Sequence, residues 1–232
     1  MNIAAYCGFS LTFIFMPVFL LDDSLWFPPV EEAMPDGLLA AGGDLGVERL
    51  LLAYRSGIFP WYNEDEIPLW WSPDPRFVLF PDELKVSKSM QRVIRNHEFN
   101  FKVNTAFNEV ICNCAHTKRK GQPGTWISED IVEAYTRLHE LGYAYSAEAW
   151  HEGSLAGGLY GILLGNIFFG ESMFSVKSNA SKFAFIKWVE LLKEQGVVLI
   201  DCQVHTGHLE SLGAEMIGRE RFMEIISEGI RS

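Results

Sequence analysis

The chain has 232 residues, which is long enough for one large or two small hydrophobic cores. Of these residues 48% are hydrophobic and 21% charged, a composition that excludes a disordered chain. Its 19 basic and 30 acidic side chains give a net charge of −11, which excludes a uniformly basic nucleic-acid coat. The charge is uneven, because residues 85–120 contain eight basic and two acidic side chains. This positive segment is a candidate contact for an anionic partner.

The first 21 residues carry no charge, and 16 of them are apolar. A signal peptide or a membrane anchor is one interpretation of such a segment. Against it, no Lys or Arg precedes Arg49, Pro17 interrupts the run, and no small-x-small cleavage site follows. We favour Met16 as the natural start, with residues 1–15 as an upstream extension, and expect a cytoplasmic protein with no membrane contact.

The four cysteines predict no metal site. Cys112 and Cys114 form a C-x-C pair, but no second Cys/His pair at ligand spacing accompanies them, and Cys7 and Cys202 stand alone. We expect reduced thiols, as in a cytosolic protein. Phosphate-binding glycine loops and the G-x-S-x-G and H-E-x-x-H motifs are also missing, so we expect no cofactor.

The N-terminal third is punctuated by Pro and Gly. Residues 28–45 predict loop and turns, whereas residues 46–56 have the apolar periodicity of a helix. Residues 57–76 hold three Trp and four Pro, which predicts a rigid aromatic loop or a domain junction rather than regular structure.

From residue 77 onward the pattern predicts alternating strands and helices. The expected strands are 77–80, 99–103, 144–150, 155–163, 167–175 and 197–202, and the expected helices are 87–95, 106–115, 129–141, 181–194, 206–212 and 220–228. This order predicts an α+β fold: a small N-terminal domain, residues 1–77, followed by residues 78–232 with one mixed sheet of about six strands flanked by helices.

Two polar constellations interrupt apolar strands. Asp201 and Gln203 end the buried strand at 197–202, where open sheets place ligands, and their spacing of two puts both side chains on one side. The alternative is a polar pair that caps the next helix. Glu171 lies among glycine and phenylalanine, so its carboxylate must be paired or serve a cationic ligand; a structural ion pair is the alternative.

Tryptophans lie beside basic residues in the middle of the chain. Trp126 follows Lys118, Arg119 and Lys120, an arrangement suited to stacking on an unpaired base with phosphate contacts. A buried core position is the alternative for any single tryptophan, including Trp61, Trp70 and Trp71. A second basic set has helical spacing and can follow a phosphate backbone, or it is an ordinary solvated helix face: Lys85, Lys88, Arg92 and Arg95.

Seven segments in order resemble one family, the leucyl/phenylalanyl-tRNA–protein transferases. They are Gly37–Leu45 (GLLAAGGDL), Gly57–Trp61 (GIFPW), Trp70–Arg76 (WWSPDPR), Gly124–Ile127 (GTWI), Gly170–Ser175 (GESMFS), Asn179–Lys182 (NASK) and Ile200–Gln203 (IDCQ). The resemblance covers residues 24–228. It implies a bacterial cytosolic monomer that moves Leu or Phe from aminoacyl-tRNA onto an N-terminal Arg or Lys of a protein, marking it for degradation by the N-end rule.

The same resemblance implies an acetyltransferase-like (GNAT) fold for residues 78–232 and a role for each motif residue. Asp201 would orient or polarise Gln203, whose carbonyl holds the attacking amine, with the tRNA 2′-hydroxyl as the alternative proton acceptor. Trp61 and Trp126 would hold the terminal adenosine, and Glu171 would fix the aminoacyl end or the cationic acceptor. The apolar pocket would be lined by Leu159, Phe174, Trp188, Leu192 and Ile200, and tRNA would be gripped by Lys85, Lys88, Arg92, Arg95, Lys118, Arg119 and Lys120.

Two other functions remain compatible with the sequence. One is an aminoacyl-tRNA-dependent transferase with a different acceptor, such as a cell-wall peptide or a small amine. It would share the tryptophans and the basic helix but would need no carboxylate for an Arg or Lys side chain. The other is a tRNA-binding module without catalysis.

Overall fold

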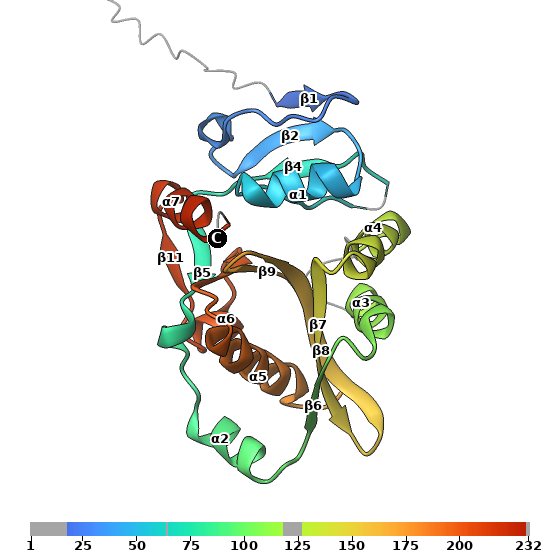
Figure 1. The fold of residues 1–232 in the computed structure, drawn as a ribbon, viewed down its shortest axis with the longest axis vertical. Coiled ribbons are helices and arrows are strands. Elements are labelled where there is room, and N and C mark those ends of the chain that lie inside the picture. The colour runs from blue at the N-terminus through green and yellow to red at the C-terminus, as the bar shows by residue number, and fades with distance from the viewer. Residues whose placement is uncertain (1–17, 64, 118–126, 231–232) are drawn as a thin grey trace, which may run out of the picture.

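A computed structural model describes residues 18–63, 65–117 and 127–230 and shows two β-sheets with helices around them (Figure 1). The predicted mixed α/β architecture with a small N-terminal part is confirmed. The expected extension at residues 1–15 lies outside the described residues. Within the described ranges, no helix combines the length and apolar character needed to cross a membrane.

The smaller sheet belongs to the N-terminal part, drawn in blue at the top of Figure 1. Its strand order is β1-β2-β4-β3, with β1 parallel to β2 and the other pairs antiparallel. The strands are β1 (Phe19–Leu21), β2 (Leu38–Gly42), β3 (Phe59–Pro60) and β4 (Leu69–Trp71), and a 3-10 turn, η1 (Val30–Glu32), precedes β2. Helix α1 (Val47–Arg55) lies between this sheet and the rest of the molecule.

These short strands correct the prediction that residues 28–45 are loop and turns and that residues 57–76, a rigid aromatic loop or a domain junction, hold no regular structure. Glycines with positive φ flank β2, Gly37 on one side and Gly42 at its end, so a five-residue strand is enclosed by turn residues. The buried Trp70 fixes β4 to β2 because its indole Nε1–H donates to the Gly42 carbonyl oxygen at 2.9 Å. Tertiary packing therefore builds strands where local composition indicates turns.

The larger sheet has seven strands, in the order β11-β5-β10-β9-β8-β7-β6, one more than expected. Its pairs are antiparallel except for β9 and β10, which run parallel. The strands are β5 (Arg76–Leu79), β6 (Asn100–Val103), β7 (Ala144–His151), β8 (Ser154–Leu164), β9 (Ile167–Ser175), β10 (Leu199–Gln203) and β11 (Glu215–Ile217), the last of which the sequence did not predict.

Helices cover both faces of the larger sheet (Figure 1). The apolar side chains of α5 form one core with one face, and those of α3 and α4 form a second core that continues into the N-terminal part. The side-chain oxygens of Ser87 and Ser128 cap α2 and α4. The elements are η2 (Pro81–Glu83), α2 (Lys88–Arg95), α3 (Phe107–His116), α4 (Glu129–Glu140), α5 (Ala180–Glu194), α6 (Gly207–Glu210) and α7 (Arg219–Gly229).

Candidate active site

A cavity of about 530 Å³ lies where β9 and β10 part from each other. Its walls come from the C-terminal halves of these two strands, from β8, from β3 of the smaller sheet, and from the start of α5 and the region of α6. The predicted residues Glu171, Asp201 and Gln203 all lie in this wall. The structure therefore brings the two polar constellations of the sequence together.

Each of the two strands has a bulge at its polar residues. In β9, Tyr160 and Gly161 of β8 face Ser172 and Gly170, so Glu171 is the extra residue. In β10, the register against β5 shifts between Asp201 and Gln203. A bulge re-aims a side chain and is common beside active sites. Here the bulges bring the side chains of Glu171 and Gln203 within hydrogen-bonding distance.

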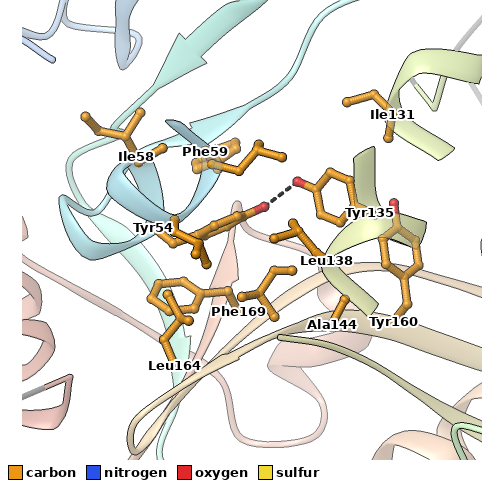
Figure 2. Packing of buried hydrophobic residues seen from close by; sticks show 14 of the residues in the cluster. Tyr54, Ile58, Phe59, Ile131, Tyr135, Leu138, Ala144, Tyr160, Leu164 and Phe169 are labelled. Carbon is orange, nitrogen blue, oxygen red and sulfur yellow. Dashed lines mark hydrogen bonds between the residues drawn. The ribbon is translucent and has the colours of Figure 1, made fainter. Parts of the chain in front are cut away.

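Three neutral donors converge on the carboxylate of Glu171. The Tyr54 hydroxyl donates to Oε1 at 2.7 Å, the Gln203 side-chain amide donates to Oε1 at 2.9 Å, and the Tyr135 hydroxyl donates to Oε2 at 3.2 Å. Tyr54 comes from α1 and Tyr135 from α4, and their hydroxyl oxygens also lie within hydrogen-bonding distance of each other (Figure 2). Each hydroxyl has one proton, so it donates either to Glu171 or to the other hydroxyl at any one time. Three separate elements therefore hold one carboxylate of β9.

This environment changes the acidity of Glu171. Burial is the largest influence, and the negative charge of Asp201 acts in the same direction, so the pKa of Glu171 rises from its ordinary 4.5 to about 7. The hydrogen bonds from Tyr54, Tyr135 and Gln203 act against this rise. Burial also raises the pKa of both tyrosines well above 10, so they donate as neutral hydroxyls. At neutral pH, Glu171 is poised between its acid and base forms.

Asp201 is held in a buried ion pair with Arg76. The guanidinium Nε donates to Oδ1 at 2.9 Å and Nη2 donates to Oδ2 at 2.7 Å, with both side chains fully buried. The guanidinium lies between the rings of Phe59 and Phe222, and its Nη1 donates to the Gly57 carbonyl oxygen at 3.2 Å. This bidentate geometry is the strong form of such a pair. The charge of Asp201 is therefore offset within the protein.

Gln203 connects these two carboxylates in different ways. Its backbone N–H donates to Asp201 Oδ1 at 2.9 Å, and its side-chain Nε2 donates to Glu171. Its φ of +63° is unusual for a residue other than glycine and places it in the left-handed region. The resemblance led us to expect that Asp201 orients or polarises Gln203. In the structure Asp201 bonds to the backbone of Gln203, and Glu171 is the residue bonded to its side-chain amide. The carbonyl Oε1 of the amide remains an acceptor at the cavity wall.

Four further expected residues line the cavity, and two lie elsewhere. Trp61, Leu159, Phe174 and Ile200 are in the wall. Trp188 and Leu192, expected in the apolar pocket, lie in the core under α5, where Trp188 packs on Phe168 and Tyr145. The reason is that these two positions of α5 face the sheet rather than the cavity. Trp126, Lys118, Arg119 and Lys120 lie outside the described residues.

The basic helix is solvent-exposed. Lys85, Lys88, Arg92 and Arg95 are all exposed on or just before α2, whose Met90 and Val93 pack inward. In Figure 1, α2 lies at the end of the molecule away from the smaller sheet, with most of the larger sheet between them. The location leaves the predicted tRNA contact available to a long, charged ligand.

Sequence reasoning missed Tyr54, Tyr135 and Arg76. Both tyrosines occupy apolar-periodic positions of helices, so the pattern indicated core residues. Arg76 ends the WWSPDPR motif and was identified as part of the resemblance without a role. Arg76 could have been found from its position at the start of an apolar strand. An arginine there is buried, and a buried charge needs a partner of opposite charge.

The family model described as "Leucyl/phenylalanyl-tRNA protein transferase" matches residues 78–227, and the model of its N-terminal domain matches residues 43–74. The chain belongs to this family. A "Leucyl/phenylalanyl-tRNA--protein transferase" of Syntrophobacter fumaroxidans is 57% identical over 93% of this chain and 92% of its own, and one of Flavobacterium johnsoniae is 56% identical over 90% and 99%.

Solved structures with a related arrangement are more distant. The structure of L-PGS from Bacillus licheniformis is 14% identical, with a TM-score of 0.39 over 72% of this chain and 53% of that one. A GCN5-related N-acetyltransferase-like protein from Streptococcus suis is 13% identical, with a TM-score of 0.37 over 69% of this chain and 59% of that one. This chain thus spans little more than half of either protein.

Proposed function

We propose that this protein transfers leucine or phenylalanine from aminoacyl-tRNA to the N-terminal Arg or Lys of a protein. Membership in the transferase family supports this reaction class. The observation that carries the proposal is the Glu171–Gln203 pair, a carboxylate and an amide held at 2.9 Å in the wall of one cavity. Such a pair holds an amine and accepts its proton.

The chemistry needs few groups from the enzyme. An aminoacyl ester is already activated, so no covalent enzyme intermediate is required. The nucleophile is an α-amine with a pKa of about 7.7–8, so roughly a tenth of it is neutral at pH 7. The enzyme must hold amine and ester together and accept a proton as the new bond forms.

Gln203 and Glu171 divide this task in the proposed mechanism. The Gln203 Oε1 accepts a hydrogen bond from the attacking amine while its Nε2 stays bonded to Glu171. The amine nitrogen bonds to the ester carbonyl carbon, and its proton passes to the Glu171 carboxylate. The C–O bond to the ribose then breaks, and that proton goes to the leaving oxygen, which leaves Glu171 ionised for the next cycle.

The charges of the site favour a cationic acceptor. Asp201 is offset by Arg76, whereas the hydrogen-bond donors of Glu171 are hydroxyls and an amide, which carry no charge. Ionised Glu171 therefore gives the cavity a negative charge that attracts an N-terminal Arg or Lys. The apolar wall of Leu159, Phe174 and Ile200 suits a leucyl or phenylalanyl side chain.

The test is transfer of radiolabelled Leu or Phe from charged tRNA to peptides that differ only in their first residue. We expect labelling of Arg- and Lys-starting peptides and none of an Ala-starting control. Equal labelling of all three would favour the transferase with a different acceptor, and no labelling by folded protein with normal tRNA affinity would favour the tRNA-binding module.

We also propose that the protein is a cytoplasmic monomer. Light scattering tests the oligomeric state, and cell fractionation tests the location.

A further inference from the structure

Lys182 is a cation at an electrostatically unfavourable position. It lies in the first turn of α5, which holds no acidic residue. The positive end of the helix dipole is at this terminus, so the helix itself repels a lysine here. The other two lysines of α5 are paired, Lys187 with Glu190 and Lys193 with Asp82. Lys182 therefore needs a counter-charge that the helix does not supply.

No acidic side chain pairs with Lys182 in the part of the chain that the structure describes, residues 18–63, 65–117 and 127–230. Among all other residues of the sequence, only Glu64 is acidic. Residues 118–126, which follow the cavity-wall residue Thr117, include neither Asp nor Glu. An anionic ligand is the other source of a counter-charge.

Lys182 lies at the α5 end of the cavity. Ser181 precedes it and Phe185 follows within one turn, and both side chains line the cavity. His208 of α6 lines the same cavity. Burial lowers the pKa of this imidazole, and the positive charge of Lys182 lowers it further. The charge of Lys182 is thus felt at the cavity wall.

The cavity consequently has two ends of opposite charge. Glu171 lies at the end where β9 and β10 part, whereas Ser175 and Ser181 lie at the α5 end. The Ser181 backbone N–H donates to Ser175 Oγ at 3.3 Å, which ties the end of β9 to the start of α5. Glu171 and Ser175 are four residues apart along one strand, or about 13 Å. A ligand that bridges the two ends is therefore longer than an aminoacyl group alone.

We propose that Lys182 binds the phosphodiester group that joins the terminal adenosine of the donor tRNA to the preceding nucleotide. The inference rests on the proposed function and adds one contact to it. Going from the aminoacyl ester into the RNA, this phosphate is the first negative charge. With the ester held at Gln203 and Glu171, the phosphate is repelled by the ionised carboxylate and attracted to the α5 end.

The other substrate fits Lys182 poorly. The acceptor in the proposed reaction begins with Arg or Lys, and a lysine repels that side chain. A lysine binds phosphate as a point charge on a long, flexible stem, so it does not need the fixed geometry of an arginine. Lys182 and the exposed cations of α2 thus have separate tasks: Lys182 contacts the last phosphate of the RNA, and α2 contacts phosphates farther from the ester.

The experiment varies the length of the donor, because only a donor with a phosphate can use the contact. Three donors carry the same ester: phenylalanyl-adenosine without a phosphate, phenylalanyl-cytidylyl-adenosine with one, and phenylalanyl-tRNA. We expect Lys182→Gln to raise the KM for the dinucleotide and for the tRNA about tenfold, the effect of one charge-assisted hydrogen bond. The KM for phenylalanyl-adenosine and the kcat at saturating donor stay unchanged.

Two further variants separate the contact from net charge. Lys182→Arg keeps the charge and is expected to retain most of the affinity for the dinucleotide. Lys187→Gln is the matched control, because it removes one charge from the same helix at a residue that is paired with Glu190 and is not in the cavity wall. We expect it to leave all three KM values unchanged.

The outcomes distinguish this inference from the proposed function. A rise of KM confined to the two donors with phosphate supports the contact. The same rise for phenylalanyl-adenosine, the same rise in Lys187→Gln, or no rise for the dinucleotide overturns it and leaves the transfer reaction intact. A rise of KM only for acceptor peptides with Asp or Glu near the first residue overturns it in favour of an anionic acceptor. Failure of the wild type to transfer from any donor to an Arg-starting peptide overturns the proposed function, and this inference with it.

Discussion

The side-chain amide of Gln203 donates to Glu171 at 2.9 Å, whereas Asp201 accepts from the backbone N–H of the same glutamine. The two carboxylates thus support different parts of one residue. Asp201, locked to Arg76, fixes the backbone, and Glu171 meets the group that faces the cavity. This division places the proton-accepting role on Glu171 in the proposed mechanism.

Replacing Glu171 by Gln is expected to lower kcat by about 100-fold or more, because a positioned general base contributes that much. In the wild type, kcat rises with pH through about 7 as Glu171 ionises. In the variant, the only rise of kcat with pH that remains is the one near pH 8, where the acceptor amine loses its proton. The exposed Glu210→Gln is the control, and a variant profile that keeps the limb at pH 7 would contradict the role.

The two tyrosines influence the pH at which kcat rises as Glu171 ionises, which is called the Glu171 limb of the pH profile below. Tyr54→Phe removes a donor at 2.7 Å to Glu171, so the carboxylate is less stabilised and the limb moves to higher pH by about one unit. Tyr135→Phe, which removes a donor at 3.2 Å, gives a smaller shift. The pH profile of kcat measures both. Tyr145→Phe, stacked on Trp188 away from the site, serves as the control. A lowered rate with an unmoved limb would refute the assignment.

The buried pair of Arg76 and Asp201 is expected to govern stability. Asp201→Ala leaves the Arg76 guanidinium buried without its counter-charge, which costs about 3–5 kcal/mol of unfolding free energy. Urea unfolding measures the loss, and the double variant Arg76→Met with Asp201→Leu recovers much of it. Breaking the exposed Arg221–Glu224 pair costs less than about 1 kcal/mol. A single variant that unfolds like the wild type would show that the pair is dispensable.

Glu171 also links stability to pH. Its pKa in the folded protein, about 7, is above its ordinary 4.5, so the folded state holds the proton more tightly than the unfolded chain. The stability from this group is complete below pH 4.5 and is lost as pH rises through 7, by about 3 kcal/mol in all. Urea unfolding from pH 4.5 to 8 should show this decline in the wild type. Glu171→Gln should lack it, and parallel curves for the two proteins would disprove the linkage.

The basic face of α2 can be tested by salt dependence. Neutralising Lys88, Arg92 and Arg95 to Gln is expected to raise the KM for aminoacyl-tRNA. The slope of log binding constant against log salt concentration should become shallower by about 2, because each lost phosphate contact removes roughly 0.7–0.9. The KM for the acceptor peptide stays constant. The charge-matched control neutralises three exposed cations on other helices, Arg137, Lys193 and Arg221. An equal effect of both triple variants would indicate net charge rather than a contact on α2.

The sequence predicted the strands that carry Glu171, Asp201 and Gln203, because apolar runs with a polar end are visible without tertiary information. It did not predict β2 or β4, where packing overrides turn-forming composition. The sequence also could not place Trp188, since an apolar position in a helix does not show whether the side chain faces the core between α5 and the sheet or the cavity beside it. The tyrosines were hidden for the same reason: their rings are core residues, and only their hydroxyl ends belong to the site.

The hydrogen bond from Tyr54 to Glu171 joins residues 117 positions apart, from the helix of the N-terminal part to a strand of the larger sheet. A fragment that starts at residue 78 would lose this hydroxyl, Arg76 and the first half of β5. Its carboxylate would be tuned to a different acidity before any substrate arrived. The front of the chain therefore acts as a fixed part of the catalyst, and recombination that exchanged it for an unrelated module would leave Glu171 without the hydroxyl that tunes its acidity.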